Sequence, residues 1–459
     1  MPDRIGMHPS SMSLFDFILF FVYIFIFYLV FYWRRRRYKD PLLRKYQKHG
    51  FWIKVFSSLA YSMFVLYLSP GDTTGLFFPE GYNIYKLILK DPSNLDLLFI
   101  QGKDFDQALL ANIANLGYFS EESNYLVSKI VAALSFITFG KFLVINLFFS
   151  MISFTGVWRL FRFFYEQYPD MHKQFAIGIL YLPTFVFWSS GILKDPLCTG
   201  AMGWITYALY AIFIKRKNIL ANIIIFLLFS YLLVVLKVYI IVSYLPFFIM
   251  FLLLQNVTLI RNKAMKAFIV LGFIVGSMAG FLTITQTMQK ALGNFAAEGM
   301  VKTIKTYQVN FENQADIASS NFSLGVEFDG TAQSLLRIEP AAVVATLYRP
   351  FLWESKKPST FLSSLESLAI MLLTIYTIFR VGLRRMVSTI IKKPIVMYCL
   401  LYSLMFSLFV GATTLNFGTL VRYKIPGLPF YVIAMFLLLY FNRKPKKMPA
   451  GTDGQTELT

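Results

Sequence analysis

Long apolar runs separated by short, charged segments repeat along almost the whole chain. Most runs have 17 to 21 residues, which is close to the length that a helix needs to cross the apolar core of a bilayer, about 30 Å thick. The pattern predicts an all-α fold, a polytopic bundle of about eleven transmembrane helices. The predicted spans are 14–33, 51–69, 141–161, 174–190, 197–214, 219–236, 238–255, 266–284, 361–379, 394–412 and 425–441.

Composition supports a membrane protein and excludes several other classes. Hydrophobic residues make up 57% of the 459 residues, and charged residues only 15%, whereas soluble domains carry about 25% charged residues. The net charge of +20 comes from clusters beside the apolar runs, such as 34–37 and 443–447, so it does not indicate a nucleic-acid partner. Two unpaired cysteines and three scattered histidines indicate neither a disulfide framework nor a zinc site.

The basic clusters also predict a topology. If the loop 34–50 is cytoplasmic, alternation of the spans places 26 of the 44 Lys and Arg residues on that side, with only 5 of the 24 acids. This is the bias that the positive-inside rule describes. We therefore expect the N-terminus outside, the C-terminus in the cytoplasm, and a disordered cytoplasmic tail at 448–459.

The chain reads as a single integral membrane domain over 1–459 with two large outer loops, 70–140 and 285–360. Within the first loop, the apolar stretch 126–140 is only fifteen residues long and contains Lys129, so we expect a helix lying at the outer interface. The second loop is expected to be partly helical.

Unusual polar residues fall at the predicted outer ends of the spans. Ionisable groups at membrane depth are costly and tend to mark substrate paths. A plainer interpretation is open for each of them: a wetted turn, a helix cap, a snorkelling side chain or an interface anchor. The residues are Asp72, Glu80, Lys194, Asp195, Lys237, Arg349, Glu354, Asn416, Arg422 and Lys424.

Acids and cations gathered just outside a bilayer suit chemistry on a lipid-linked phosphate. Lys and Arg side chains hold a phosphate and stabilise it as a leaving group. A carboxylate accepts the proton of an acceptor hydroxyl as a glycosidic bond forms. We therefore predict an enzyme that moves a sugar from a polyprenyl-phosphate or polyprenyl-pyrophosphate donor to a glycan or lipid acceptor.

The arrangement resembles the GT-C superfamily of polyprenyl-phosphate-sugar-dependent glycosyltransferases. The motifs "PGDTTG", "LPTFVFWSSGILKDPL", "LYRPFLWE" and "NFGTLVRYKIPGLPF" also look like those of bacterial polytopic proteins of exopolysaccharide or O-antigen synthesis. The resemblance implies an inverting transferase in the cytoplasmic (inner) membrane.

By this resemblance, Asp72 and Asp195 are the catalytic acids, with Asp72 as the base and Asp195 positioning the acceptor or a metal. Phosphate binding would fall to Lys194, Lys237, Arg349 and Arg422, with Glu80, Glu354 and Asn416 beside the substrate. The helix at 14–33 is an addition to the family layout.

The chain also departs from the family at Asp72, which lacks an adjacent acid. Glu80, Asp104 and Asp106 are candidate partners, and a need for a divalent metal ion is left open.

Two other functions fit the same residues. A polysaccharide polymerase joins lipid-linked repeat units at the same face, and outer arginines such as Arg337, Arg349 and Arg422 suit it. A transporter or lipid-linked sugar flippase is the non-enzyme alternative, although such proteins often carry internal repeats, and none is evident here.

Overall fold

The computed structural model describes residues 12–101, 121–257, 321–325, 332–355 and 358–443. These residues form helices and turns with no strand, and one isolated β-bridge joins Asn321 to Asn416. Seven of the described helices are long and apolar enough to cross a membrane, or eight if a pair bent by 62° is one span. The prediction of an all-α, multi-pass membrane protein is confirmed for this part of the chain.

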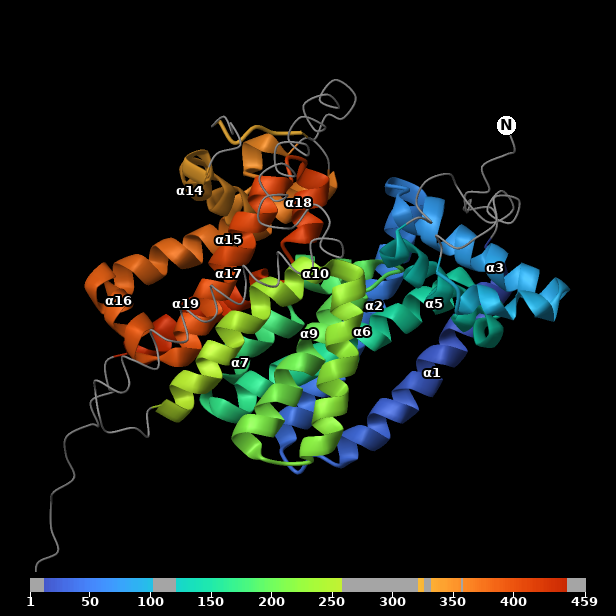
Figure 1. Cartoon of the computed structure of the whole chain (residues 1–459), viewed down its shortest axis with the longest axis horizontal. Helices are drawn as coiled ribbons and strands as arrows, with labels where there is room; N and C mark the ends of the chain where they lie inside the picture. The colour runs from blue at the N-terminus through green and yellow to red at the C-terminus, as the bar shows by residue number, and fades with distance from the viewer. Residues whose placement is uncertain (1–11, 102–120, 258–320, 326–331, 356–357, 444–459) are drawn as a thin grey trace, which may run out of the picture.

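The described helices pack into one body, with α6 and α9 at its centre (Figure 1). The helices α1, α2, α3 and α5 lie on one side of this centre, and α14 to α19 lie on the other. The helices are α1 (Leu14–Arg36), α2 (Pro41–Met63), α3 (Phe78–Lys90), α5 (Glu122–Thr138), α6 (Phe142–Gln167), α7 (His172–Phe175), α8 (Pro183–Trp188), α9 (Lys194–Tyr210), α10 (Ile219–Val257), α14 (Ala332–Tyr348), α15 (Pro358–Val381), α16 (Leu383–Lys392), α17 (Pro394–Thr413), α18 (Phe417–Tyr423) and α19 (Leu428–Phe441).

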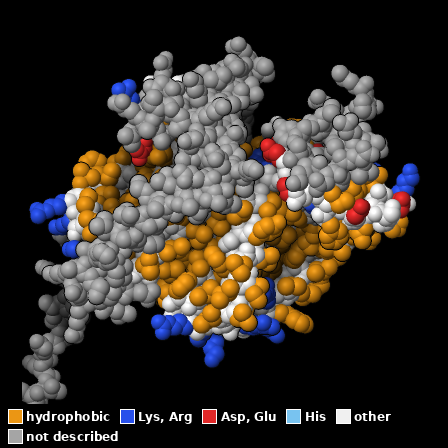
Figure 2. Space-filling view, viewed as in Figure 1, with side chains coloured by type: hydrophobic (Ala, Val, Ile, Leu, Met, Phe, Trp, Pro, Cys, Tyr) orange, Lys and Arg blue, Asp and Glu red, His pale blue; other side chains and the backbone are white. Residues whose placement is uncertain are grey.

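Charge is segregated on the surface of this body. Figure 2 shows a broad hydrophobic band, with Lys and Arg side chains mainly at its lower and left edges and acidic side chains mainly near the upper edge. In the view of Figure 1, the lower edge holds the turn between α9 and α10, which carries Lys215, Arg216 and Lys217. An apolar band with unlike charges at its two edges is the surface that a bilayer-spanning protein presents.

Glycines bring α6 and α9 into backbone contact. A Cβ atom on Gly156 would lie 1.8 Å from the carbonyl oxygen of Gly200, and one on Gly203 would lie 1.9 Å from that of Gly156. Small residues at such crossings let membrane helices pack closely without a hydrophobic driving force. The close crossing explains why a "CTGAMG" stretch stands in the middle of an otherwise bulky chain.

The two central helices run in the same direction. Asn146 bonds to Ile192, Ser153 to Thr199 and Arg162 to Tyr207, so positions advance together along both helices. The chain must therefore return between them, and it does so through α7, a π-helical turn at Ala176–Leu180, and α8. The predicted span 174–190 is therefore a broken one, because Leu182 is non-helical and Pro183 starts a new helix.

The helix α10 is interrupted at Lys237, whose backbone is non-helical (φ −153°, ψ 78°). The Lys237 side chain contacts Asp195 at the start of α9. Farther along both helices, Tyr244 of α10 bonds to Thr206 of α9. The second arm of α10 therefore runs parallel to α9, while its first arm returns from the turn after α9, as the two diverging arms in Figure 1 show. The predicted division between 219–236 and 238–255 agrees with this break.

The remaining predicted segments agree with the structure, differ from it or lie outside it. The helix predicted at 126–140 is present as part of α5, which ends at Thr138 and packs along α3. From the second predicted loop, α14 packs against α17, where a Cβ atom on Gly411 would lie 2.1 Å from the carbonyl oxygen of Ala342. The predicted span 425–441 begins at Leu428, after the bend that follows α18. The predicted span 266–284 and the tail 448–459 lie outside the described residues.

Candidate functional site

A buried carboxylate at the start of α9 holds two cations from distant parts of the chain. The Asp195 side chain is 1% exposed, and its Oδ1 lies 2.6 Å from Nζ of Lys237. Its Oδ2 lies 2.6 Å from Nε of Arg422, on α18. The first turn of a helix favours a negative charge because the free N–H groups there carry partial positive charge. Asp195 therefore joins α9, the break in α10 and α18 at one point.

The second carboxylate lies at the open edge of this group. Asp72 precedes the π-helical turn Thr73–Phe77, and its Oδ2 lies 2.8 Å from Nη1 of Arg422. The Asp72 side chain is 51% exposed, whereas that of Arg422 is 16% exposed. We call Asp72, Asp195, Lys237 and Arg422 the charge network; its two acids and two cations balance.

Hydrogen bonds fix the turn between α8 and α9, which leads into the first turn of α9 and Asp195. Oδ1 of Asn146 accepts from the backbone N–H of Ile192 at 2.9 Å. The Thr73 hydroxyl donates to the carbonyl oxygen of Ile192 at 2.8 Å, and the Tyr61 hydroxyl lies 2.7 Å from the Thr73 oxygen. The residue after Asp72 is thus tied to the turn before Asp195, so the distance between the two acids is built into the fold.

Gly191, in the same turn, is packed so closely that there is no room for a side chain. A Cβ atom on Gly191 would lie 1.9 Å from the Tyr61 ring. The ring is 1% exposed and packs against Phe187 and Trp188. Glycine is therefore required here by close packing.

Lys237 lies between its carboxylate partner and an aromatic ring. Its Nζ is 4.4 Å from the centroid of Tyr423, the residue next to Arg422. A desolvated ammonium gains from such a ring face in addition to its ion pair. The side chain is 8% exposed, so Lys237 is a structural member of the network and does not snorkel away from the bundle.

The structure places the other predicted site residues in three separate settings. Lys194 is half-buried and donates to Ser123 on α5 at 2.7 Å. Arg349 pairs with Glu354, and its guanidinium lies 4.3 Å from the Phe322 ring and 5.2 Å from that of Phe417, the first residue of α18. Glu80 is buried on α3 and accepts from Ser128 at 3.0 Å.

Asn416 and Lys424 hold the two ends of α18. The Asn416 side chain caps the helix by accepting from the N–H groups of Gly418 and Thr419, at 2.9 and 3.3 Å. Lys424, 1% exposed, donates to the carbonyl oxygen of Arg349 and to the Ser367 hydroxyl. These bonds fix the two ends of the helix that carries Arg422, and among the described residues neither Asn416 nor Lys424 bonds to Asp72 or Asp195.

Several residues that support the network were not predicted from the sequence. Lys54, 3% exposed in α2, donates to the carbonyl and hydroxyl oxygens of Ser189, the C-cap of α8. A cation at a helix C-terminus is favourable, and the lone Lys in "GFWIKVFSS" is a signal that could have found it. Tyr61 and Asn146 are ordinary residues in apolar runs and Thr73 is an ordinary residue in a polar turn, so none of them carries such a signal.

The acids of the described residues do not gather into a cluster of metal-ligand side chains. No group of three or more His, Cys, Asp and Glu side chains converges in the described part of the chain. Both oxygens of Asp195 already bind cations, and Glu80 accepts a hydrogen bond from Ser128. The predicted partners Asp104 and Asp106 lie outside the described residues.

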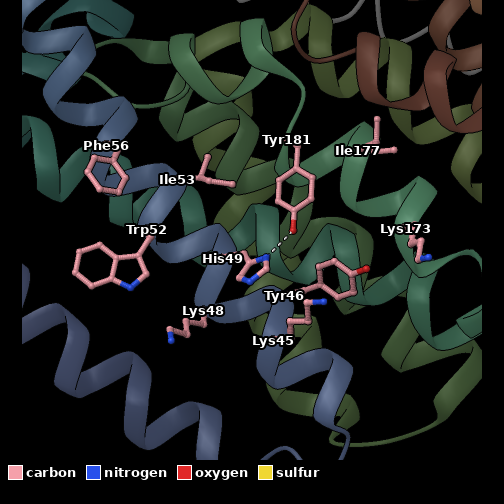
Figure 3. A pocket seen from close by; sticks show the side chains of 10 residues that line it. All are labelled: Lys45, Tyr46, Lys48, His49, Trp52, Ile53, Phe56, Lys173, Ile177 and Tyr181. Atoms are coloured by element: carbon pink, nitrogen blue, oxygen red, sulfur yellow. Dashed lines mark hydrogen bonds between the residues drawn. The ribbon is translucent and has the colours of Figure 1, made fainter.

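A separate groove between α2 and the α7 region has a different set of lining residues. It encloses about 750 Å³, and Figure 3 shows His49 directed at Tyr181 across it, with a 3.1 Å contact between Nδ1 and the hydroxyl. Trp52, Ile53 and Phe56 extend its wall along α2, and its charged lining is basic. Since no carboxylate lines it, the groove lacks the acid that the charge network has.

Searches against protein-family models, curated proteins and solved structures gave no match for this chain. The resemblance to the GT-C superfamily thus rests on the motifs alone, and function has to be argued from the charge network.

Proposed function

We propose that this chain is an integral membrane glycosyltransferase that uses a polyprenyl-phosphate or polyprenyl-pyrophosphate sugar donor at the outer face of the cytoplasmic membrane. The observation that carries the proposal is the pairing of Asp72 with Arg422 at 2.8 Å, where a half-exposed carboxylate meets an anchored guanidinium. One group can take a proton and the other can hold a phosphate. Both lie at helix ends, which in the proposed topology are at the depth of a lipid headgroup.

Arg422 is suited to bind the phosphate of the donor because only part of its guanidinium group is engaged by the two carboxylates. Nε binds Asp195 and Nη1 binds Asp72, and Nη2 has no hydrogen-bond partner among the described residues. A planar guanidinium binds phosphate oxygens through pairs of N–H groups. A donor phosphate that displaces Asp72 from Nη1 would gain a bidentate contact and release Asp72 to the acceptor.

In the proposed step the acceptor hydroxyl oxygen attacks the anomeric carbon of the donor sugar. Its proton passes to the Asp72 carboxylate, and the bond between the anomeric carbon and the phosphate oxygen breaks. That oxygen keeps the electron pair, and the leaving polyprenyl phosphate or pyrophosphate is stabilised by Arg422. Asp195 acts as a positioning residue, because it holds Arg422 and Lys237 and does not face the open edge.

The test is glycosyl transfer in membranes that contain the protein. Membranes are supplied with polyprenyl-phosphate and polyprenyl-pyrophosphate donors carrying radiolabelled hexoses, and labelled glycan product is measured. We expect Asp72→Asn to lower transfer by about 100-fold or more, which is the usual contribution of a general base. We expect Asp195→Asn to abolish transfer as well, because Arg422 and Lys237 lose their shared anchor.

The matched control is Asp170→Asn, which removes an exposed carboxylate in the turn Pro169–Met171, outside the charge network. It should transfer at the normal rate. Wild-type product yield from Asp72→Asn, at equal protein level in the membrane, would overturn the assignment. Product chain length then separates the two enzyme readings, since a polymerase sets a length distribution and a single-sugar transferase does not.

A further inference from the structure

A second cavity lies at the other end of α6 and α9 and is lined by four arginines. It encloses about 240 Å³ between α1, α2, α6 and α9, and we call it the arginine cavity. Arg34 and Arg37 come from the end of α1, and Arg159 and Arg162 come from α6. Along α9, nine residues separate Asp195 from Trp204 in its wall, which is about 14 Å of helix.

Cations in this cavity outnumber the acids that touch them. Glu166 binds Arg162 and Lys215, each at 2.6 Å. No carboxylate of the described residues lies within ion-pair distance of Arg34, Arg37 or Arg159. Three guanidinium groups therefore converge on one space without a carboxylate, and like charges held together at the edge of an apolar slab repel one another.

The wall of the cavity holds the Arg159 side chain against an aromatic ring, whereas Arg34 and Arg37 are exposed. The guanidinium of Arg159 lies 3.5 Å from the centroid of the Trp204 ring, and the Trp204 N–H donates to Thr155 at 2.9 Å. The Trp158 N–H donates to the Tyr38 hydroxyl at 2.9 Å. A guanidinium that stacks through its face keeps its in-plane N–H groups for an acceptor.

One further polar group in the wall lacks a partner. Gln47, on α2, is 3% exposed, and its Oε1 has no hydrogen-bond partner among the described residues. A buried polar atom left without a partner costs free energy, so a bound group with a hydroxyl or water attached would satisfy it. Basic residues that only set membrane orientation stay solvated, whereas Arg159 and Arg162 are half-buried in the cavity wall.

We propose that the arginine cavity is a binding site for a phosphate-bearing anion. Guanidinium groups bind phosphate through paired, charge-assisted hydrogen bonds, and several of them together match the two or more charges of a phosphate monoester or pyrophosphate. One water needs about 15 Å³ of such space, so the cavity admits a group of several heavy atoms. The phosphate can belong to the headgroup of a membrane lipid or to a soluble compound.

The experiment uses the full-length protein, purified in detergent and in lipid nanodiscs, in buffers free of phosphate. Pyrophosphate binding is measured by calorimetry in detergent. Phosphatidic acid retention is measured by native mass spectrometry after nanodisc extraction, against phosphatidylcholine. Pyrophosphate binding alone assigns a soluble ligand, and selective retention of phosphatidic acid alone assigns a lipid headgroup.

Arg37→Gln and Arg159→Gln should each weaken binding of the positive probe by about tenfold or more. Arg384→Gln, which removes an exposed positive charge on α16, should leave it unchanged. Arg37 is exposed at the end of α1, so its replacement keeps the test open if Arg159→Gln fails to fold. Binding of neither probe, or equal loss in Arg37→Gln and Arg384→Gln, would overturn the proposal.

Discussion

The charge network and the arginine cavity gather cations at opposite ends of the same two helices, but they differ in how those cations are balanced. In the network, Lys237 and Arg422 share the buried Asp195, and Asp72 adds the second negative charge. In the cavity, Arg34, Arg37 and Arg159 have no carboxylate within reach among the described residues. The comparison teaches that the chain pairs its buried cations with its own carboxylates, whereas at the other end it leaves the half-buried Arg159 and the exposed Arg34 and Arg37 open to an anion from outside the chain.

The largest expected effect comes from breaking the balance in the network. Lys237→Met leaves Asp195 with one cation instead of two in a buried site. Removing one partner of a buried ion pair costs about 3–5 kcal/mol, so we expect the largest fall in unfolding free energy among these variants, measured by denaturant unfolding in detergent.

A double variant provides the control for that effect. Asp195→Asn combined with Lys237→Met removes both charges and should recover part of the lost stability, because no unpaired charge remains. If the stability lost in the double variant equals the sum of the losses in the two single variants, Asp195 and Lys237 are not energetically coupled.

A smaller loss of stability is expected from disturbing the turn that precedes α9 and Asp195. In Gly191→Ala the new Cβ atom meets the Tyr61 ring, and such overpacking costs about 1–3 kcal/mol. Gly71→Ala is the matched control, because nothing lies within 4 Å of a Cβ atom there. Thermal unfolding of the two variants should differ clearly; equal melting temperatures would contradict the packing described for the turn.

Arg422→Lys tests geometry at constant charge. A lysine provides one ammonium group, so it cannot reach Asp195 and Asp72 together as the guanidinium fork does. We expect donor binding to weaken by about tenfold, one charge-assisted hydrogen bond being worth at least about 1.5 kcal/mol. Arg443→Lys, at the exposed end of α19, should bind donor normally, and equal weakening in both would argue against phosphate binding by Arg422.

The smallest effect is expected at the arginine cavity without ligand. Arg37→Gln removes a charge that has no carboxylate partner, so the unfolding free energy in phosphate-free, low-salt buffer should change by no more than about 0.5 kcal/mol. The same measurement with saturating ligand should separate wild type from variant. A loss as large as that of Lys237→Met would show that Arg37 has an anion within the chain.

The sequence was informative where charge interrupts an apolar run. Lys237, Asp195 and Arg422 are ionisable residues whose burial needs a partner, which makes them visible in the sequence. Asp72 is half-exposed and was visible only as an acid at the end of a predicted span. Arg349 and Glu354 were singled out in the same way, but their pairing with each other was not predicted. For Glu80 and Lys194, a similar expectation did not reveal that their contacts lie on α5.

Other features were not readable because they depend on packing. The interruption at Leu182 and Pro183 was hidden by the hydrophobic character of the whole run 174–190, although proline was a signal. The close crossing of Gly156 with Gly200 and Gly203 depends on which helices are neighbours. From the sequence, the arginines of the cavity were interpreted only as part of the charge bias that sets membrane orientation. Hydropathy cannot distinguish a solvated arginine from one that stacks on Trp204.

The most direct test of the account is the side of the membrane that each charged region faces. Cys198 and Cys399 are both buried and would be replaced by Ala, after which Gly71→Cys marks the network and Lys39→Cys marks the arginine cavity. Both positions are exposed and leave Asp72 and Arg37 in place. Intact cells are treated with a membrane-impermeant maleimide. The account predicts that position 71 is labelled at once and position 39 only after permeabilisation; labelling of both from the same side, or of position 39 alone, would contradict it.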